Sequence, residues 1–195
     1  MRQTTIYFDL GSPFAYLSVE RARAVLPGPV ALRPVLLGGL FKLNGRSSWA
    51  LGDPERRRDG MAEVERRARA IGLPPLRWPD PWPGDYLTAM RVATFAQQTG
   101  VLWDFVERAF HSAFAEGNDL SQPAHVLRAA AAAGLDAQAV EAAVAAPEVK
   151  SALRDATDAA HRLGVFGVPT MAVGEQLLWG DDRLEDAARA VDRIG

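Results

Sequence analysis

The chain has 195 residues, of which 48% are hydrophobic and 24% are charged, which is ordinary for a soluble globular protein with one ample core. The formal net charge of −2 argues against a nucleic-acid or membrane-surface partner, and no apolar run approaches the length of a membrane span. There is no cysteine, which excludes disulfides, thiolate zinc sites, iron–sulfur clusters and a protein thiol nucleophile. Since the N-terminus lacks the regions of a signal peptide, we expect a cytoplasmic protein.

The N-terminal part of the chain predicts a strand, a helix and a second strand. Thr4 to Leu10 alternates apolar positions as a strand does, and Pro13 to Leu26 follows as an amphipathic helix. After a Pro-Gly-Pro turn, residues 30–37 predict a second strand, in which Pro34 favours an edge position. A strand, a helix and a strand of these lengths imply a right-handed crossover and a parallel pair.

The middle of the chain is predicted to be helical. Turn signals at Gly38-Gly39 and Asn44-Gly45 flank a short apolar piece, and residues 46–53 resemble a loop. Residues 72–84 carry many prolines and two tryptophans, so we expect an ordered aromatic loop there. The predicted helices span residues 54–71, 86–99, 103–114, 122–132, 136–145 and 148–163.

After Gly164 the sequence returns to strand character. Residues 165–173 predict a strand, and Gly174-Glu175 predicts a hairpin turn into a second short strand at 176–179. Asp181 or Asp182 is then expected to cap a final helix over residues 183–194.

The predicted order is therefore strand–helix–strand, a block of helices, and strand–strand–helix. The outer parts alone have the arrangement of a thioredoxin fold. We predict an α/β protein with a thioredoxin-like domain formed by residues 1–40 and 164–195, and an inserted all-helical domain at 41–163.

In a thioredoxin-like fold the corner after the first strand carries function. Ser12 is a preferred N-cap and Pro13 a preferred first helical residue, so a helix is expected to begin there with an exposed hydroxyl and free N–H groups. The opposing X-Pro bond is Val168–Pro169, and a cis bond would turn the Val168 backbone towards a peptide-like ligand. The alternatives are a serine that only caps its helix and an ordinary trans proline.

Four blocks in this chain, spread over nearly its full length, carry a more specific resemblance. They are FDLGSPFAYL at 8–17, LGGLFK at 37–42, the segment from Trp82-Pro83 to Leu87-x-Ala89-x-Arg91, and the segment from GVFGVPTM at 164–171 to WGxDRL at 179–184. Together they resemble the thioredoxin-fold family of 2-hydroxychromene-2-carboxylate isomerases and kappa-class glutathione transferases, relatives of the DsbA oxidoreductases. In this family a serine replaces the first cysteine of the DsbA C-x-x-C pair, here Ser12, and Ala15 stands at the second position.

The resemblance implies that the cofactor is glutathione. Its thiol would lie at the helix N-terminus, where the Ser12 hydroxyl and the helix dipole would lower the thiol pKa by about one to several units. Val168 would pair with the cysteinyl backbone, and the turn at Asp181 and Asp182 matches the family's γ-glutamyl-binding turn, although helix capping is the alternative for either aspartate. The predicted glutathione-binding residues are Ser12, Asn44, Val168, Pro169, Asp181 and Asp182.

In the isomerase interpretation, the thiolate adds to 2-hydroxychromene-2-carboxylate, the ring opens, a single bond rotates and glutathione leaves. The alternatives are a kappa-type transferase or peroxidase with the same site, and a thioredoxin-fold binding protein without turnover. The resemblance also implies a homodimer. A cation is expected to hold the carboxylate of the small aromatic substrate or of the glycyl residue, and the candidates are Lys42, Arg56, Arg57 and Arg58.

Two departures from the family pattern lie near the expected cleft. Asp85 stands where the family commonly has Asn, and a carboxylate there would repel an anionic substrate. Asn44-Gly45 stands where the family often has Gly-Asn. The three histidines lack the spacing of metal ligands, and no metal is predicted.

Overall fold

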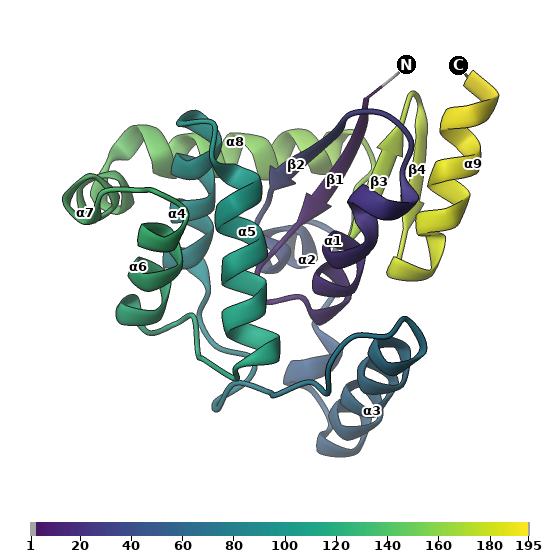
Figure 1. Ribbon diagram of the computed structural model, residues 1–195, viewed down its shortest axis with the longest axis horizontal. Helices are drawn as coiled ribbons and strands as arrows, with labels where there is room; N and C mark the ends of the chain where they lie inside the picture. The colour runs from purple at the N-terminus through teal and green to yellow at the C-terminus, as the bar shows by residue number, and fades with distance from the viewer. Residues whose placement is uncertain (1–2, 195) are drawn as a thin grey trace.

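The structure is a computed structural model that describes residues 3–194, and four strands form its mixed sheet (Figure 1). The strand order is β2-β1-β3-β4, which makes β1 and β3 central and β2 and β4 the edges. β1 (Thr4–Phe8) runs parallel to β2 (Val30–Pro34) and antiparallel to β3 (Thr170–Val173), which forms a hairpin with β4 (Gln176–Trp179). The predicted parallel pair, the C-terminal hairpin and the edge position of Pro34 are thereby confirmed.

The helices follow the predicted order, with one helix between β1 and β2, a long block between β2 and β3, and one helix after β4 (Figure 1). The chain thus has the thioredoxin fold, with a helical block inserted between β2 and β3, that the order of elements predicts. In chain order the helices and helical turns are α1 (Pro13–Val25), α2 (Leu37–Leu43), η1 (Trp49–Leu51), α3 (Pro54–Ala70), α4 (Leu87–Gln98), α5 (Leu102–Phe110), the π-helical turn η2 (His111–Ala115), α6 (Pro123–Ala132), α7 (Ala137–Ala145), α8 (Pro147–Arg162), η3 (Asp181–Arg183) and α9 (Leu184–Ile194).

The predicted turn at Gly38-Gly39 is wrong, because both glycines lie inside α2. Tertiary contacts outweigh the weak helix propensity of glycine here. The N–H of Leu36, which precedes the helix, donates to Thr157 Oγ1 of α8 at 3.0 Å. A Cβ on Gly39 would approach Thr157 Cγ2 to 3.2 Å, so a small residue suits the crossing of α2 and α8.

Three strands and one helix are shorter in the structure than the sequence predicts. β1 and β2 end at Phe8 and Pro34, and β3 begins only at Thr170. Proline has no N–H to give to a sheet, which limits β2 at its end and β3 at its start. The helix predicted over residues 103–114 ends its α-helical part at Phe110 and continues as η2.

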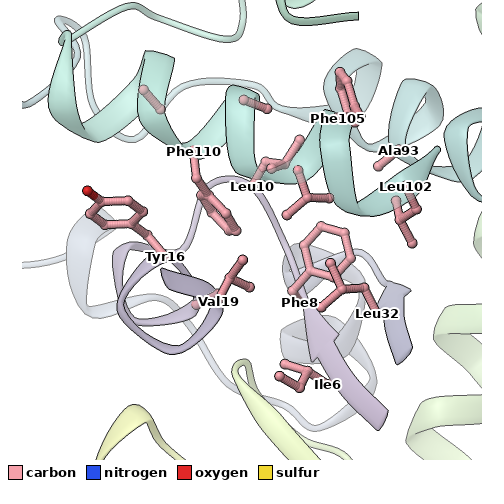
Figure 2. Close-up of a cluster of buried hydrophobic side chains, with 14 of the residues drawn as sticks. Ile6, Phe8, Leu10, Tyr16, Val19, Leu32, Ala93, Leu102, Phe105 and Phe110 are labelled. Atoms are coloured by element: carbon pink, nitrogen blue, oxygen red, sulfur yellow. The ribbon is translucent and has the colours of Figure 1, made fainter. Parts of the chain in front are cut away.

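The side chains of β1 alternate between two buried clusters on the two faces of the sheet. Ile6 and Phe8 belong to the larger cluster, and Tyr7 belongs to the smaller one, which α2 and α8 complete. Figure 2 shows Phe8 facing residues of the helical block, and its ring centroid lies 6.2 Å from that of Phe110 in α5. The sheet and the helical block therefore share one hydrophobic core. Within residues 3–194, no helix is long and apolar enough to cross a membrane.

Candidate functional site

An open cavity of about 950 Å³ lies at the C-terminal end of β1, where α1 begins. Its walls come from the β1–α1 corner, from α2 and the segment after it, from the loop before α4, and from the loop before β3. Ser12 and Val168, which are far apart in the sequence, both line it. The volume lies within the range of roughly 300–1,000 Å³ that is typical of small-molecule sites.

Ser12 caps α1 and also forms a hydrogen bond to the loop before β3. Its Oγ accepts the N–H of Ala15 at 3.2 Å, and its hydroxyl donates to the Val168 carbonyl at 3.4 Å. The expected cap at Ser12-Pro13 is confirmed, but the expectation of an exposed hydroxyl is wrong, since Ser12 is only 4% exposed. Ser12 lines the cavity, so a ligand would reach it from there.

The first turn of α1 leaves one backbone donor for a ligand. Pro13 has no N–H, Ala15 donates to Ser12 Oγ, and Tyr16 donates to the Ser12 carbonyl at 3.1 Å. The N–H of Phe14 has no hydrogen-bond partner among the residues that the structure describes. Phe14 lines the cavity, so an anion there would meet this N–H, the Ser12 hydroxyl and the positive end of the helix dipole.

The Val168–Pro169 peptide bond is cis, which settles the alternative left open by the sequence. The N–H of Val168 has no partner within residues 3–194, while its carbonyl accepts from Ser12. The Pro169 carbonyl accepts the N–H of Gly180 at 2.9 Å. This bond ties the loop at Val168 to the turn after β4, where Asp181 and Asp182 lie.

The other predicted glutathione-binding side chains lie outside the wall of this cavity. Asp181 is buried and pairs with Arg67 of α3, whose Nη1 lies 2.6 Å from Asp181 Oδ1. Burial raises the pKa of Asp181, and Arg67 offsets part of that rise. Asp182 is exposed beside it. Asn44 Nδ2 donates to the Leu40 carbonyl at 2.7 Å and so ends α2.

Asp9 is a cavity residue that the sequence interpretation missed. Its two carboxylate oxygens accept the N–H groups of Gly11 and Leu37, each at 2.8 Å, and so hold the Ser12 corner against the start of α2. Burial raises the pKa of Asp9 from 3.8 to about 6, although both hydrogen bonds lower it. An acidic residue at the end of an apolar strand was the available signal.

Two arginines line the cavity. Of the predicted cations only Arg56 does so, and the sequence interpretation missed the second, Arg46. The guanidinium of Arg46 lies 4.9 Å from the ring centre of Phe166, which in turn lies 4.9 Å from the ring of Trp179. Neither arginine forms an ion pair within the described part of the chain. Both are therefore available to a carboxylate.

Asp85 lines the cavity on the side of the loop before α4. Its Oδ1 accepts the N–H of Leu87, the first residue of α4, at 3.0 Å, so the side chain helps to fix the loop at the start of α4 and also places a carboxylate at the site. In residues 3–194 there is no group of histidine, aspartate and glutamate side chains that could hold a metal ion.

Comparison with known proteins places this chain in a family. The family model described as the DSBA-like thioredoxin domain matches residues 3–192. The chain is 30% identical over 193 residues to 2-hydroxychromene-2-carboxylate isomerase of Sphingobium xenophagum, covering 92% of both chains. It is 27% identical over 205 residues to human glutathione S-transferase kappa 1, covering 94% of this chain and 88% of that one.

Its fold is similar to a solved structure of 2-hydroxychromene-2-carboxylate isomerase, with a TM-score of 0.89, 24% identity and coverage of 99% of this chain and 96% of that one.

Proposed function

The chain belongs to the DsbA-like thioredoxin family, among the 2-hydroxychromene-2-carboxylate isomerases and kappa-class glutathione transferases, and we propose that it is a glutathione-dependent isomerase of 2-hydroxychromene-2-carboxylate. One observation carries the proposal. Ser12, Phe14 and Val168 line one cavity in a chain without cysteine, and the N–H groups of Phe14 and Val168 have no partner within residues 3–194. Such a site suits a thiol that the ligand brings.

The residues present fit glutathione. Val168 offers a backbone N–H and C=O to the cysteinyl residue, and the cavity is large enough to hold a second molecule beside the peptide. Bound glutathione would supply a thiolate that adds reversibly to the substrate and leaves after the bond has rotated.

The work of this chain is to hold the sulfur as an anion. The Ser12 hydroxyl turns its hydrogen from the Val168 carbonyl, 3.4 Å away, to the sulfur. Together with the Phe14 N–H and the helix dipole, it lowers the thiol pKa by about one to several units.

Arg56 is the proposed partner of the substrate carboxylate, because it alone among the four predicted cations lines the cavity. An ion pair there would orient the aromatic substrate relative to the sulfur.

A kappa-type transferase is the second candidate, and Asp85 favours it. A carboxylate in the cavity wall disfavours an anionic substrate and leaves a neutral electrophile unaffected. The same residues would activate the thiol in both enzymes.

The test begins with titration calorimetry. Absence of binding at millimolar glutathione would exclude both enzymes and leave a binding protein without glutathione chemistry. If glutathione binds, turnover of 2-hydroxychromene-2-carboxylate supports the isomerase, whereas turnover of a chloro-nitroarene alone supports the transferase.

On the family resemblance we also propose a homodimer that acts in the cytoplasm. Light scattering measures the assembly directly, and a monomer mass would contradict the dimer.

A further inference from the structure

A buried carboxylate follows β1, next to the Ser12 corner. The N–H of Ser12 donates to the Asp9 carbonyl at 3.0 Å, which closes a tight turn from Asp9 to Ser12. The Cα atoms at the two ends of such a turn lie within about 7 Å of each other. Asp9 lines the cavity but is only 7% exposed. Its carboxylate therefore lies beside the place where the proposed function puts the sulfur of glutathione.

No positive charge compensates this carboxylate. Its two oxygens accept the N–H groups of Gly11 and Leu37, and Asp9 takes part in none of the ion pairs within residues 3–194. These two neutral donors do not replace the lost hydration, because burial raises the pKa of Asp9 from 3.8 to about 6. Asp9 therefore gains or loses its charge close to neutral pH.

The groups packed around Asp9 do not exchange protons in the same range. The ring of Tyr86, from the loop before α4, packs against the turn. Burial raises the pKa of Tyr86, and the charges of Asp119 and Asp9 raise it further, so this phenol stays protonated. The start of α2 contributes the backbone N–H of Leu37, and the side chain that α8 places beside it, Thr157, is uncharged.

An ionised sulfur beside Ser12 would meet two opposing influences. The Ser12 hydroxyl, the Phe14 N–H and the helix dipole favour the thiolate. The Asp9 carboxylate repels it, and the repulsion is strong because Asp9 and Ser12 are both buried. Solvent screens the other charged side chains of the cavity wall, which are exposed: Arg46, Arg56 and Asp85.

We propose that Asp9 and the thiol of bound glutathione share one proton near neutral pH. When the sulfur ionises, its S–H bond breaks and the Asp9 carboxylate gains a proton through the solvent of the open cavity. The proposal rests on glutathione being the ligand of this cavity. Asp9 does not touch the sulfur but acts on it through its charge, which raises the thiol pKa that Ser12 lowers. A thiol whose pKa lies near the ambient pH is the most effective nucleophile.

The first test uses the unmodified protein. Two coupled groups titrate in two steps that belong to the pair and to neither group alone. The ultraviolet absorbance of the thiolate, followed against pH in the glutathione complex, is therefore expected to rise over a wider pH range than that of free glutathione. A curve that fits the loss of one independent proton would contradict the coupling.

Asp9→Asn should act on the sulfur in the direction opposite to Ser12→Ala. The pKa of the bound thiol is expected to fall by about one unit, because the thiolate loses a neighbour that repels it. The titration should narrow to one step. Calorimetry in two buffers of different ionisation enthalpy should count more protons released on binding near neutral pH, since no carboxylate takes one up. A residue that only holds the corner would give the opposite shift, because a loosened corner takes donors away from the sulfur.

The matched control is Thr157→Val, which loosens the start of α2 without changing a charge. Thr157 Oγ1 accepts the N–H of Leu36 at 3.0 Å, next to the Leu37 N–H that Asp9 accepts, and Thr157 lies outside the cavity wall. The thiol of this variant should keep the pKa and the broad titration of the unmodified protein.

Two outcomes would overturn the proposal in distinguishable ways. If Asp9→Asn binds glutathione and its thiol pKa is unchanged or higher, Asp9 only holds the corner, and the proposed function is untouched. If the unmodified protein binds no glutathione, the proposed function fails and the shared proton fails with it. Should Asp9→Asn not fold, the shape of the titration in the unmodified protein decides.

Discussion

The Ser12 hydroxyl and the Val168 carbonyl lie 3.4 Å apart, at the long limit of a hydrogen bond between segments separated by 156 positions. Such a long bond is weak, so the hydroxyl can turn to an anionic acceptor at little cost. The second bond of Ser12, from the Ala15 N–H, uses an oxygen lone pair and leaves the hydrogen free to turn. One side chain can therefore cap α1 and serve a bound anion together.

Replacing Ser12 by alanine should raise the pKa of the bound glutathione thiol by about one unit or more, because the thiolate loses a donor. The ultraviolet absorbance of the thiolate, followed against pH, measures this shift. Ser12→Thr keeps a hydroxyl and serves as the control. The lost cap should also lower the free energy of unfolding by about 0.5–2 kcal/mol. An unchanged thiol titration would leave Ser12 as a cap alone.

Asp9 should make stability depend on pH. Its pKa is raised from 3.8 to about 6 by burial, so the folded protein holds this proton more tightly than the unfolded chain does. The stabilisation from this group is fully present below about pH 3.8 and is lost as pH rises through about 6. A shift of about two units corresponds to roughly 3 kcal/mol.

Asp9→Asn provides the comparison, because asparagine does not titrate. Urea unfolding of both proteins between about pH 4 and pH 8 should show the unmodified protein losing roughly 3 kcal/mol relative to the variant. Other titrating groups cancel in this difference. A difference that is flat with pH would show that Asp9 keeps an ordinary pKa.

Arg56→Gln should raise the KM for a carboxylate-bearing substrate by about two- to fivefold with little change in kcat, since an exposed ion pair contributes about 0.2–1 kcal/mol. The KM for a neutral electrophile should not change. Arg58→Gln is the matched control, because Arg58 is exposed on the same helix and does not line the cavity. Equal effects of the two substitutions would indicate a general effect of surface charge.

Two glycines of the cavity should differ in their tolerance of alanine. A Cβ on Gly11 would lie 2.6 Å from Cδ2 of the buried Tyr86, and one on Gly167 would lie 2.7 Å from Nε1 of Trp179, which is 51% exposed. Gly11→Ala should cost about 1–3 kcal/mol of unfolding free energy, as overpacking does, whereas Trp179 can swing into solvent and Gly167→Ala should cost less than about 1 kcal/mol. Urea denaturation compares them, and Tyr86→Leu should partly rescue Gly11→Ala. Equal costs at both positions would contradict this explanation.

Local patterns along the chain were sufficient to predict most of the fold. Caps, prolines and hydrophobic periodicity marked the helices, and Pro34 indicated an edge strand. The error at Gly38-Gly39 has a tertiary cause, since α2 is held by Thr157 from a helix more than a hundred residues later. No local pattern carries that information.

The candidate site divides in the same way. Ser12 and the Val168–Pro169 loop were predictable, because each has a recognisable local motif and their meeting follows from the order of the strands. The pair of Arg67 and Asp181 was not, because spacing along the chain says nothing about an ion pair between α3 and the turn after β4. Arg46 lies in a loop whose sequence shows no pattern, and its position at the cavity depends on the contact of its guanidinium with the ring of Phe166.

The central pair of the sheet joins opposite ends of the chain, since Thr4 of β1 lies opposite Val173 of β3. β1 is among the first segments to be synthesised, and it cannot form its central pairing until β3, near the end of the chain, has been made. The high contact order of this pairing favours slow folding, and it makes the C-terminal segment indispensable. Truncation before Thr170 would remove β3 and β4 and leave the edge of β1 that faces β3 without a partner. Loss of the edge strand β4 alone would leave β1 paired on both sides.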